Sequence, residues 1–290
     1  MMKRQKTENQ IRTDQDKIKI DAGHVMAALL LVFILLVSLF APLLAPYDPY
    51  QLDMRHALEP PCAAHLLGTD AIGRDVLSRI MYGGRQSLLL AAAATGLSMT
   101  LGCIIGMIAG YFGGKTDLVI TAVSNVFQGI PGMTMMIAIA GLMGSGVTSM
   151  LLALVITSWV GFSRLVRGEV MKLKQEYFVE GLKGLGAGNM RILLLHIGPN
   201  LIGSILIIFA TRIASAMLSV ASLSFLGLGL QPPTPDWGVM ISDARTHFRQ
   251  VPMLAIAPGV MIVLLSLSIN ILADALRDRL DVRADVVKGD

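Results

Sequence analysis

The chain has 290 residues, of which 54% are hydrophobic and only 15% are charged, and its mean hydropathy is +0.65. Soluble globular domains carry roughly 25% charged residues, and disordered segments combine low hydrophobicity with high charge, so this composition excludes both classes and indicates an integral membrane protein. The net charge of +4 does not indicate a nucleic-acid partner, because the charges lie at the ends of apolar runs rather than on one phosphate-binding face.

The first segments of the chain predict a tail, a span and a long loop. Residues 1–22 are polar and are expected to form an N-terminal tail. The apolar run that follows, Val25–Ala45, lacks a small-residue cleavage site followed by a soluble domain, so we interpret it as a retained span rather than a signal peptide. The next segment, 46–87, contains Pro60 and Pro61 and then a polar, helix-like stretch near residues 70–82.

The rest of the chain contains five further apolar runs, which we compare with the roughly 20 helical residues that cross a bilayer core. The fourth run is short and the fifth is long, and a tilt or a break would absorb the difference. We therefore predict an all-α integral membrane protein in which residues 23–290 form one transmembrane domain with six transmembrane helices. The predicted spans are Val25–Ala45, Leu88–Tyr111, Leu118–Leu142, Val147–Phe162, Ile197–Leu226 and Leu254–Ala273.

The distribution of Lys and Arg predicts the orientation of these spans. Six spans place both termini on one side of the membrane. With the termini in the cytoplasm, most of the 24 Lys and Arg residues fall in cytoplasmic segments, as the positive-inside rule requires. The predicted outer segments, 46–87 and 227–252, carry only Arg55, Arg74, Arg79, Arg85, Arg245 and Arg249. The segment 163–196 and the tail 274–290 are then cytoplasmic.

Motifs for catalysis or cofactor binding are incomplete. Gly114-Lys115-Thr116 resembles the end of a P-loop, but the required preceding glycine is replaced by Ala109. Gly144-Ser145-Gly146 has no histidine within a span to act as a base, and Cys62 with His65 supplies too few ligands for a metal site. We therefore expect no catalytic residue, cofactor or metal in this chain. A membrane-embedded enzyme or an ion-coupled carrier stays as the alternative class, although the carrier predicts paired intramembrane carboxylates that spans one to five lack.

The cytoplasmic segment 163–196 is basic and contains a glycine-rich stretch, 175–200. Glycines at 181, 184, 186 and 188 weaken a continuous helix. The stretch therefore predicts a short helix that ends near residues 184–188, a turn, and a second helix leading into the fifth span.

This stretch resembles the EAA loop of bacterial ABC-importer permeases, in which a glutamate, a glycine and a proline keep a fixed spacing. Glu180, Gly186 and Pro199 stand at that spacing, whereas Gly181 and Leu182 replace the two alanines of the motif. Longer stretches are similar to the second permease subunit of the dipeptide/oligopeptide/nickel importers. They are HLLGTDAIGRDVLSRIMYGGRQSL (65–88), AGYFGGKTD (109–117), SLSFLGLGLQPPTPDWGVMISDAR (222–245) and DALRDRLD (274–281).

The resemblance implies a permease of the type I ABC-importer fold with a cytoplasmic coupling helix, located in the bacterial inner membrane. Its implied partners are a second permease subunit in a heterodimer, two cytoplasmic ABC ATPases that bind ATP and Mg, an extracytoplasmic substrate-binding protein and membrane lipid. The implied cargo is a di- or oligopeptide, with nickel or a metal chelate as the alternative within the same family.

The resemblance also assigns coupling to the ATPases to residues of the EAA-like stretch. Glu180 is the main candidate, because a carboxylate at the tip can meet a basic ATPase residue. Gly186 would allow a turn with positive φ or a close approach of the ATPase surface. Arg191 either contacts the ATPase or follows the positive-inside bias. The full candidate set is Glu180, Gly181, Gly186, Arg191 and Pro199.

Two further sets of residues are singled out by charge and by loop composition. Arg212 is the basic residue deep within a span, where a charge is costly and faces a cavity or pairs with another group. It is expected in the translocation path or at the permease interface, with a snorkelling arginine as the alternative. Residues 231–245 of the proline-rich outer loop, together with residues 70–85, are expected to dock the binding protein or, alternatively, to brace the outer gate. The loop candidates are Gln231, Asp236, Trp237 and Arg245.

Overall fold

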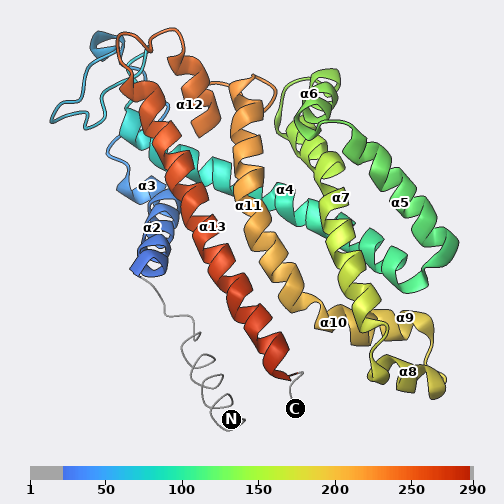
Figure 1. Cartoon of the computed structure of the whole chain (residues 1–290). Coiled ribbons are helices and arrows are strands. Elements are labelled where there is room, and N and C mark those ends of the chain that lie inside the picture. The colour runs from blue at the N-terminus through green and yellow to red at the C-terminus, as the bar shows by residue number, and fades with distance from the viewer. Residues whose placement is uncertain (1–21, 288–290) are drawn as a thin grey trace, which may run out of the picture.

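The protein is a helical bundle with short helices at both ends (Figure 1). The structure is a computed structural model that describes residues 22–287, with side chains to residue 277. Within that range it contains helices and loops and no strand. The predicted N-terminal tail lies outside the described residues except for Ala22.

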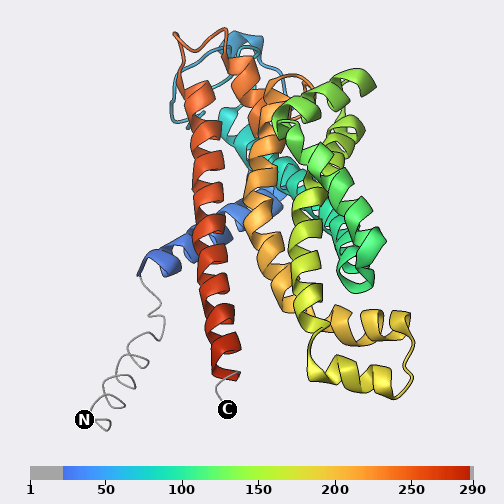
Figure 2. The ribbon, with the colours of Figure 1, turned by 45° about the vertical axis from the view of Figure 1, so that its right-hand side comes forward.

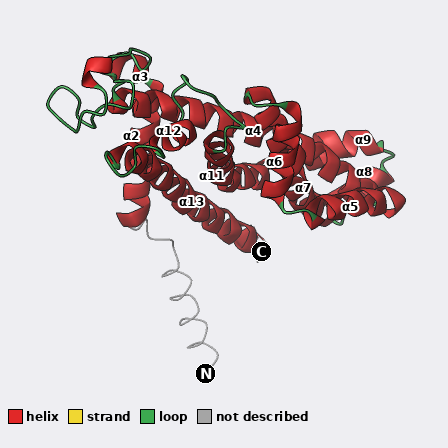
Figure 3. Cartoon of the chain, turned by 90° about the horizontal axis from the view of Figure 1, so that it is seen from above, coloured by secondary structure: helices red, strands yellow, loops and turns green. Residues whose placement is uncertain are grey.

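Five single helices are long and apolar enough to cross a membrane. They include α2 (Ala22–Leu39), α4 (Val76–Phe112) and α7 (Val147–Leu173) from the first half of the bundle. The other two are α11 (Ile202–Phe225) and α13 (Met253–Val287), the latter counted as a span over residues 253–277. Seen from above, α2 and α13 lie on one side of α11, and α5 and α7 lie on the other (Figure 3).

The predicted third span, Leu118–Leu142, is not one helix. The structure divides it into α5 (Gly114–Gly129) and α6 (Gly132–Met143), which are bent by 87° at the break. Pro131 disfavours the helical conformation of the residue before it, and Ile130 is accordingly extended with φ −99° and ψ 129°. The pair is either one broken span or a re-entrant loop, which gives up to six spans in the described chain.

Other helix bounds also differ from the prediction. The first span ends at Leu39 and is followed by a separate turn, α3 (Ala41–Leu44), which has Pro42 in its first turn. The predicted second span and the helix-like stretch before it are joined in α4, which at 1.5 Å per residue is roughly 55 Å long. A break at Leu201, before α11, shortens the long fifth span. The backbone of α13 stays helical beyond Ala273, to Val287.

Close packing of α4 against α7 forms the centre of one half of the bundle. Gly102, Gly106 and Gly110 recur every four residues along α4, and an added Cβ on each would come within 2.5–2.8 Å of an α7 carbonyl oxygen. Small residues at this spacing allow two membrane helices to approach closely. The three glycines therefore fix the position of α7 on α4.

The two ends of the bundle carry different short elements. At one end lie the loops around η1 (Met54–His56) and α12 (Trp237–Ala244), and at the other lies a hairpin of α8 (Tyr177–Gly184) and α9 (Asn189–Arg191). A π-helical turn, η2 (Ile192–Ile197), and α10 (Gly198–Asn200) connect the hairpin to α11. We call these ends the α12 end and the α8 end. α13 finishes at the α8 end (Figures 1 and 2).

Candidate functional site

The candidate coupling residues lie on a protruding helical hairpin. Figure 2 shows α8 and α9 projecting sideways from the ends of α7 and α11. Glu180, Gly181, Gly186 and Arg191 are all exposed on it, as is Pro199 at its base. Gly186 forms the turn after α8 with φ +78°, in agreement with the positive φ expected there. The predicted helix, turn and second helix are therefore present.

Apolar side chains on the hairpin are exposed beside Glu180. Tyr177 is 88% exposed and Leu185 is 86% exposed, and Phe178 and Met190 are exposed as well. Isolated exposed apolar residues are common, but several around one charged tip indicate a contact surface. We call Tyr177, Phe178, Glu180, Leu185 and Met190 the tip surface.

The base of the hairpin is packed into the bundle. Val179 of α8 is fully buried in a cluster with Tyr111 at the end of α4 and Val170 of α7. The same cluster includes residues from the connection to α11, namely Ile192, Leu193, Ile197 and Leu201. Tyr111 also donates a hydrogen bond to Asn189 Oδ1 at 3.0 Å. Packed side chains of this cluster therefore join α8 to the spanning helices α4 and α7.

A polar cavity of about 280 Å³ lies between α4, α5, α7 and α11. Its lining includes Arg212, which the sequence predicted to face a cavity. Uncharged polar side chains make up much of the rest, namely Thr95, Ser98, Gln128, Thr157, Ser158, Ser215 and Ser219. We call this the Arg212 cavity.

Arg212 lies against a glycine of the opposite helix. A Cβ built on Gly161 of α7 would stand 3.2 Å from Arg212 Nη2, so the absence of a side chain at Gly161 makes room for the guanidinium group. Arg212 makes no ion pair with any side chain in the described chain. The structure therefore places Arg212 at the lining of the cavity, with its side chain exposed.

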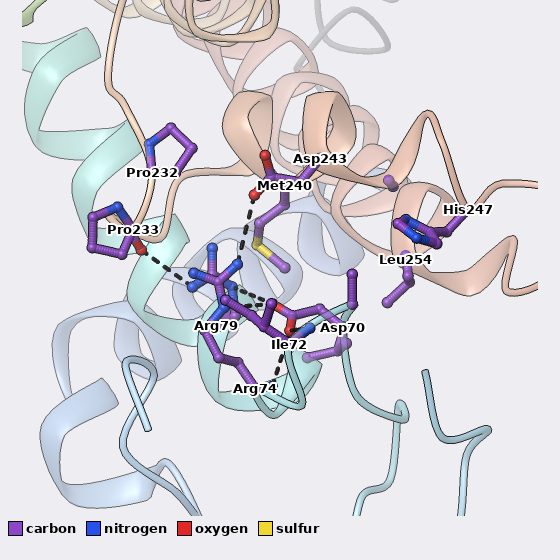
Figure 4. Close-up of a pocket in the computed structure, with 13 residues that line it drawn as sticks. Asp70, Ile72, Arg74, Arg79, Pro232, Pro233, Met240, Asp243, His247 and Leu254 are labelled. Atoms are coloured by element: carbon purple, nitrogen blue, oxygen red, sulfur yellow. Dashed lines mark hydrogen bonds and ion pairs between the residues drawn. The ribbon is translucent and has the colours of Figure 1, made fainter. Parts of the chain in front are cut away.

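The α12 end contains a cluster of two buried arginines, the half-buried Asp70 and the exposed Asp243, called here the Arg–Asp cluster (Figure 4). Asp70 accepts a hydrogen bond from Arg74 Nε at 2.6 Å and lies 3.6 Å from Arg79 Nε. Arg74 Nη2 in turn lies 3.6 Å from a carboxylate oxygen of Asp243 in α12. Arg79, only 1% exposed, donates through Nη1 to the carbonyls of Pro49 and Pro233 at 3.2 Å each. The cluster lines a cavity of about 490 Å³ and ties the start of α4 to α12.

Trp237 and Asp236 fix the start of α12 inside the bundle. Trp237 Nε1 donates to the carbonyl of Ile80 at 2.9 Å, and its ring rests where Gly83 and Gly84 leave room. Asp236 caps α12 by accepting from Val239 N at 3.1 Å, and its second oxygen accepts from Ser87 Oγ at 2.7 Å. Burial raises the pKa of Asp236 above its usual range despite these hydrogen bonds.

These positions correct the docking prediction for two of its four loop residues. Asp236 and Trp237 are both 0% exposed, so their side chains cannot touch a partner in this conformation and instead brace α12 on α4. Gln231 and Arg245 are exposed. Gln231 donates to the carbonyl of Gly227 at 2.8 Å, and Arg245 lies over the ring of Phe225 at 5.5 Å. A docking role for these two stays a prediction.

The Arg–Asp cluster is the feature that sequence reasoning missed. Residues 70–85 were assigned to docking, but their pairing with Asp243, more than 150 residues away, was not foreseen. A signal was present: Arg74 and Arg79 belong to a predicted outer segment, against the positive-inside bias. Arginines in a predicted outer segment, whose position the positive-inside rule does not explain, are candidates for buried ion pairs.

Two family models match the chain. A model described as "Binding-protein-dependent transport system inner membrane component" matches residues 102–285. A second, the N-terminal transmembrane domain of oligopeptide transport permease C, matches residues 23–61. The first covers α5 to α13, including the hairpin and Arg212, and the second covers α2, α3 and η1.

Curated relatives and a solved structure agree with these models. The chain is 40% identical over 258 residues to the glutathione transport system permease protein GsiD of Pectobacterium atrosepticum, covering 89% of this chain and 86% of that relative. It is 40% identical over 256 residues to GsiD of Escherichia coli O6:K15:H31, covering 88% and 84% of the two chains.

The fold matches a chain from inward-facing structures of the MetNI methionine ABC transporter, with a TM-score of 0.57 and 14% sequence identity. The match covers 69% of this chain and 95% of that one. It identifies the helical architecture as the type I permease fold predicted from sequence.

The family models and the relatives account for the membrane helices, the hairpin and the lack of catalytic motifs together. Relatives of this kind are transport subunits rather than enzymes. The chain therefore belongs to the family of inner-membrane components of binding-protein-dependent transport systems, as a multi-pass ABC-importer permease of the peptide-transporter branch.

Proposed function

We propose that this permease forms half of the translocation path of an ATP-driven importer of di- or oligopeptides, with the tip surface of the α8–α9 hairpin as the contact for a separate ATPase. The observation that carries the proposal is the combination of an exposed tip and a buried base in one hairpin. Glu180 is available to a partner, while Val179, the preceding residue, is buried against α4 and α7.

The proposal gives each of the expected partners a place on the molecule. Two ATPases, which bind ATP and Mg, meet the α8 end of this chain and of a second permease subunit. The α8 end and both termini face the cytoplasm, in line with the concentration of Lys and Arg in the segment 163–196. A substrate-binding protein then delivers cargo at the α12 end, where Gln231 and Arg245 are exposed.

Coupling follows from the packing at the base of the hairpin. Closure of the ATPase pair moves α8, and the shared buried cluster passes that movement to α4, α7 and the start of α11. These three helices line the Arg212 cavity. Rigid elements with two discrete packing arrangements are the physical basis of such switching, and the closed ATPase state and one permease state must stabilise each other.

The peptide cargo is supported by the relatives. The two curated relatives described above are named as permease proteins of glutathione transport systems, and glutathione is a tripeptide. The model that matches residues 23–61 is that of an oligopeptide permease.

The test is a charge reversal at the tip. We expect Glu180→Lys to abolish ATP-dependent peptide uptake by the assembled complex in proteoliposomes, while insertion and detergent stability stay at wild-type levels. Glu169→Lys, which changes an acidic residue of α7 outside the hairpin, serves as the matched control. Wild-type uptake by Glu180→Lys would contradict the coupling role.

A second experiment tests the assembly. Co-purification of two ATPases with the detergent-solubilised chain supports the importer, whereas transport by the isolated chain in the absence of any ATPase would refute it.

A further inference from the structure

The Arg212 cavity has one charged group among its lining residues. Every other polar group there is a hydroxyl or the amide of Gln128, and no acidic side chain contributes to the lining. The cavity therefore has a net positive charge located on one guanidinium group.

Arg212 has no acceptor of its own. Neither a carboxylate nor a carbonyl of the described chain accepts from it, and the guanidinium group offers five N–H donors in a planar arrangement. The guanidinium group lies against Gly161 on one side and lines the cavity. A charge at membrane depth is costly unless it is solvated or paired, so the cavity is suited to a ligand that brings the missing negative charge.

Four of the six hydroxyls that line the cavity are used as donors within their own helices. Thr95 donates to the carbonyl of Ala91 at 2.7 Å, and Ser98 donates to Ala94 at the same distance. Thr157 and Ser219 make equivalent bonds to Ala153 and Ser215, at 2.8 and 3.0 Å. These four hydroxyl oxygens keep lone pairs that can accept from a ligand, and Arg212 is the one charged donor among the lining residues.

We propose that Arg212 binds a carboxylate of the cargo as it passes through the cavity, so that the permease itself selects for cargo with a negatively charged group. A planar carboxylate is the natural partner of a guanidinium group, since the two can form paired parallel hydrogen bonds. A bare divalent cation would be repelled by the same group. This inference rests on the proposed importer function and adds a specificity residue to it.

The experiment compares two peptides that the cognate binding protein captures and that differ only in one carboxylate replaced by its amide. Initial ATP-dependent uptake is measured in proteoliposomes at saturating binding protein, for wild type, Arg212→Gln and Arg212→Lys. Because the binding protein is unchanged between variants, a shift in the acid-to-amide uptake ratio must come from the permease. Arg164→Gln is the matched control, because Arg164 is an exposed arginine of α7 that does not line the cavity.

The expected result is a loss of about tenfold in uptake of the acid peptide by Arg212→Gln, as removal of one charge-assisted contact predicts. Uptake of the amide peptide should change less than about twofold. Arg212→Lys keeps the positive charge but loses the planar pair of donors, so it should retain only part of the preference. Equal loss for both peptides with normal assembly would overturn carboxylate recognition and leave the importer function intact.

Two other outcomes are also decisive. Loss of co-purification with the second permease in Arg212→Gln would assign Arg212 to a pair across the permease interface and overturn the inference. Absence of ATP-dependent uptake by the wild-type complex would overturn the proposed function and the inference with it.

Discussion

The two ends of the molecule use their charged and aromatic residues in opposite ways. At the α12 end, Arg74, Arg79 and Asp70 pair with one another under the surface, and Trp237 is fully buried. At the α8 end, Glu180 and Tyr177 point to solvent. Groups that pair within the chain hold it together, even though Arg79 Nη2 is buried without a hydrogen-bond partner among the described residues. Groups exposed at an ordered tip are available to a partner. Substitutions should therefore affect stability at the α12 end and coupling at the α8 end.

Trp237→Ala should give the largest loss of stability. It removes a fully buried ring and its hydrogen bond to Ile80, and large-to-small substitutions of this kind cost about 3–5 kcal/mol. Thermal unfolding in detergent micelles, followed by circular dichroism at a helical wavelength, measures the effect. Trp237→Phe keeps much of the ring contact and should lose less. An unchanged melting temperature for Trp237→Ala would show that α12 is not braced as described.

Asp236→Ala should give the next largest loss. It removes the helix cap of α12 and leaves Ser87 without its acceptor, for a cost of about 1–2 kcal/mol. The same unfolding assay measures the change, and a loss below about 0.5 kcal/mol would contradict it.

Asp236 also gives a prediction for the pH dependence of stability. Because burial raises its pKa in the folded state, the folded protein binds the proton more tightly than the unfolded chain does. The contribution of Asp236 to stability is therefore fully present below the ordinary pKa of about 3.9 and falls as the pH rises through the raised value. Asp236→Asn cannot titrate, so its stability should fall less steeply from pH 4 upward than that of wild type. Equal slopes for the two proteins would contradict the raised pKa.

Gly186→Ala should give a smaller loss of stability but a clear loss of transport. The turn at Gly186 has φ +78°, and a side chain in this region costs about 1–2 kcal/mol. The strain is confined to the exposed turn after α8, so the bundle should melt near the wild-type temperature while peptide uptake falls. Gly188→Ala, in the same connection at φ −65°, controls for the added methyl group, and equal uptake by the two variants would count against a role for the turn geometry.

Glu180→Ala should have the smallest effect on stability, within about 0.5 kcal/mol, because the side chain is exposed. Its uptake should nevertheless fall well below the wild-type level. A large loss of stability in Glu180→Ala would contradict this difference between the two ends, because it would show that Glu180 contributes to folding.

The sequence alone predicted those structural features that are determined by a local pattern of residues. Long apolar runs predicted the spans, and glycines at fixed positions predicted the helix, turn and helix of the hairpin, including the positive φ at Gly186. Arg212 was recognised because one charge within an apolar run has few low-energy positions. The prediction did not place a break in the third span although Pro131 lies within it, because the run 118–142 contains no charged residue and was interpreted by its hydropathy alone.

What sequence alone determined about this protein is therefore its class: a multi-span helical permease with an ordered glycine-containing hairpin and a charge in the fifth span. Only the tertiary structure decided which polar residues are free and which are used internally. Four docking candidates come from the same segment of the outer loop, yet they differ in exposure. Asp236 and Trp237 are buried, whereas Gln231 and Arg245 are exposed. The burial of Asp236 and Trp237 depends on their hydrogen bonds to Ser87 and Ile80 of α4, about 150 residues away in the sequence. Burial is set by such long-range packing, which no local pattern of residue types encodes.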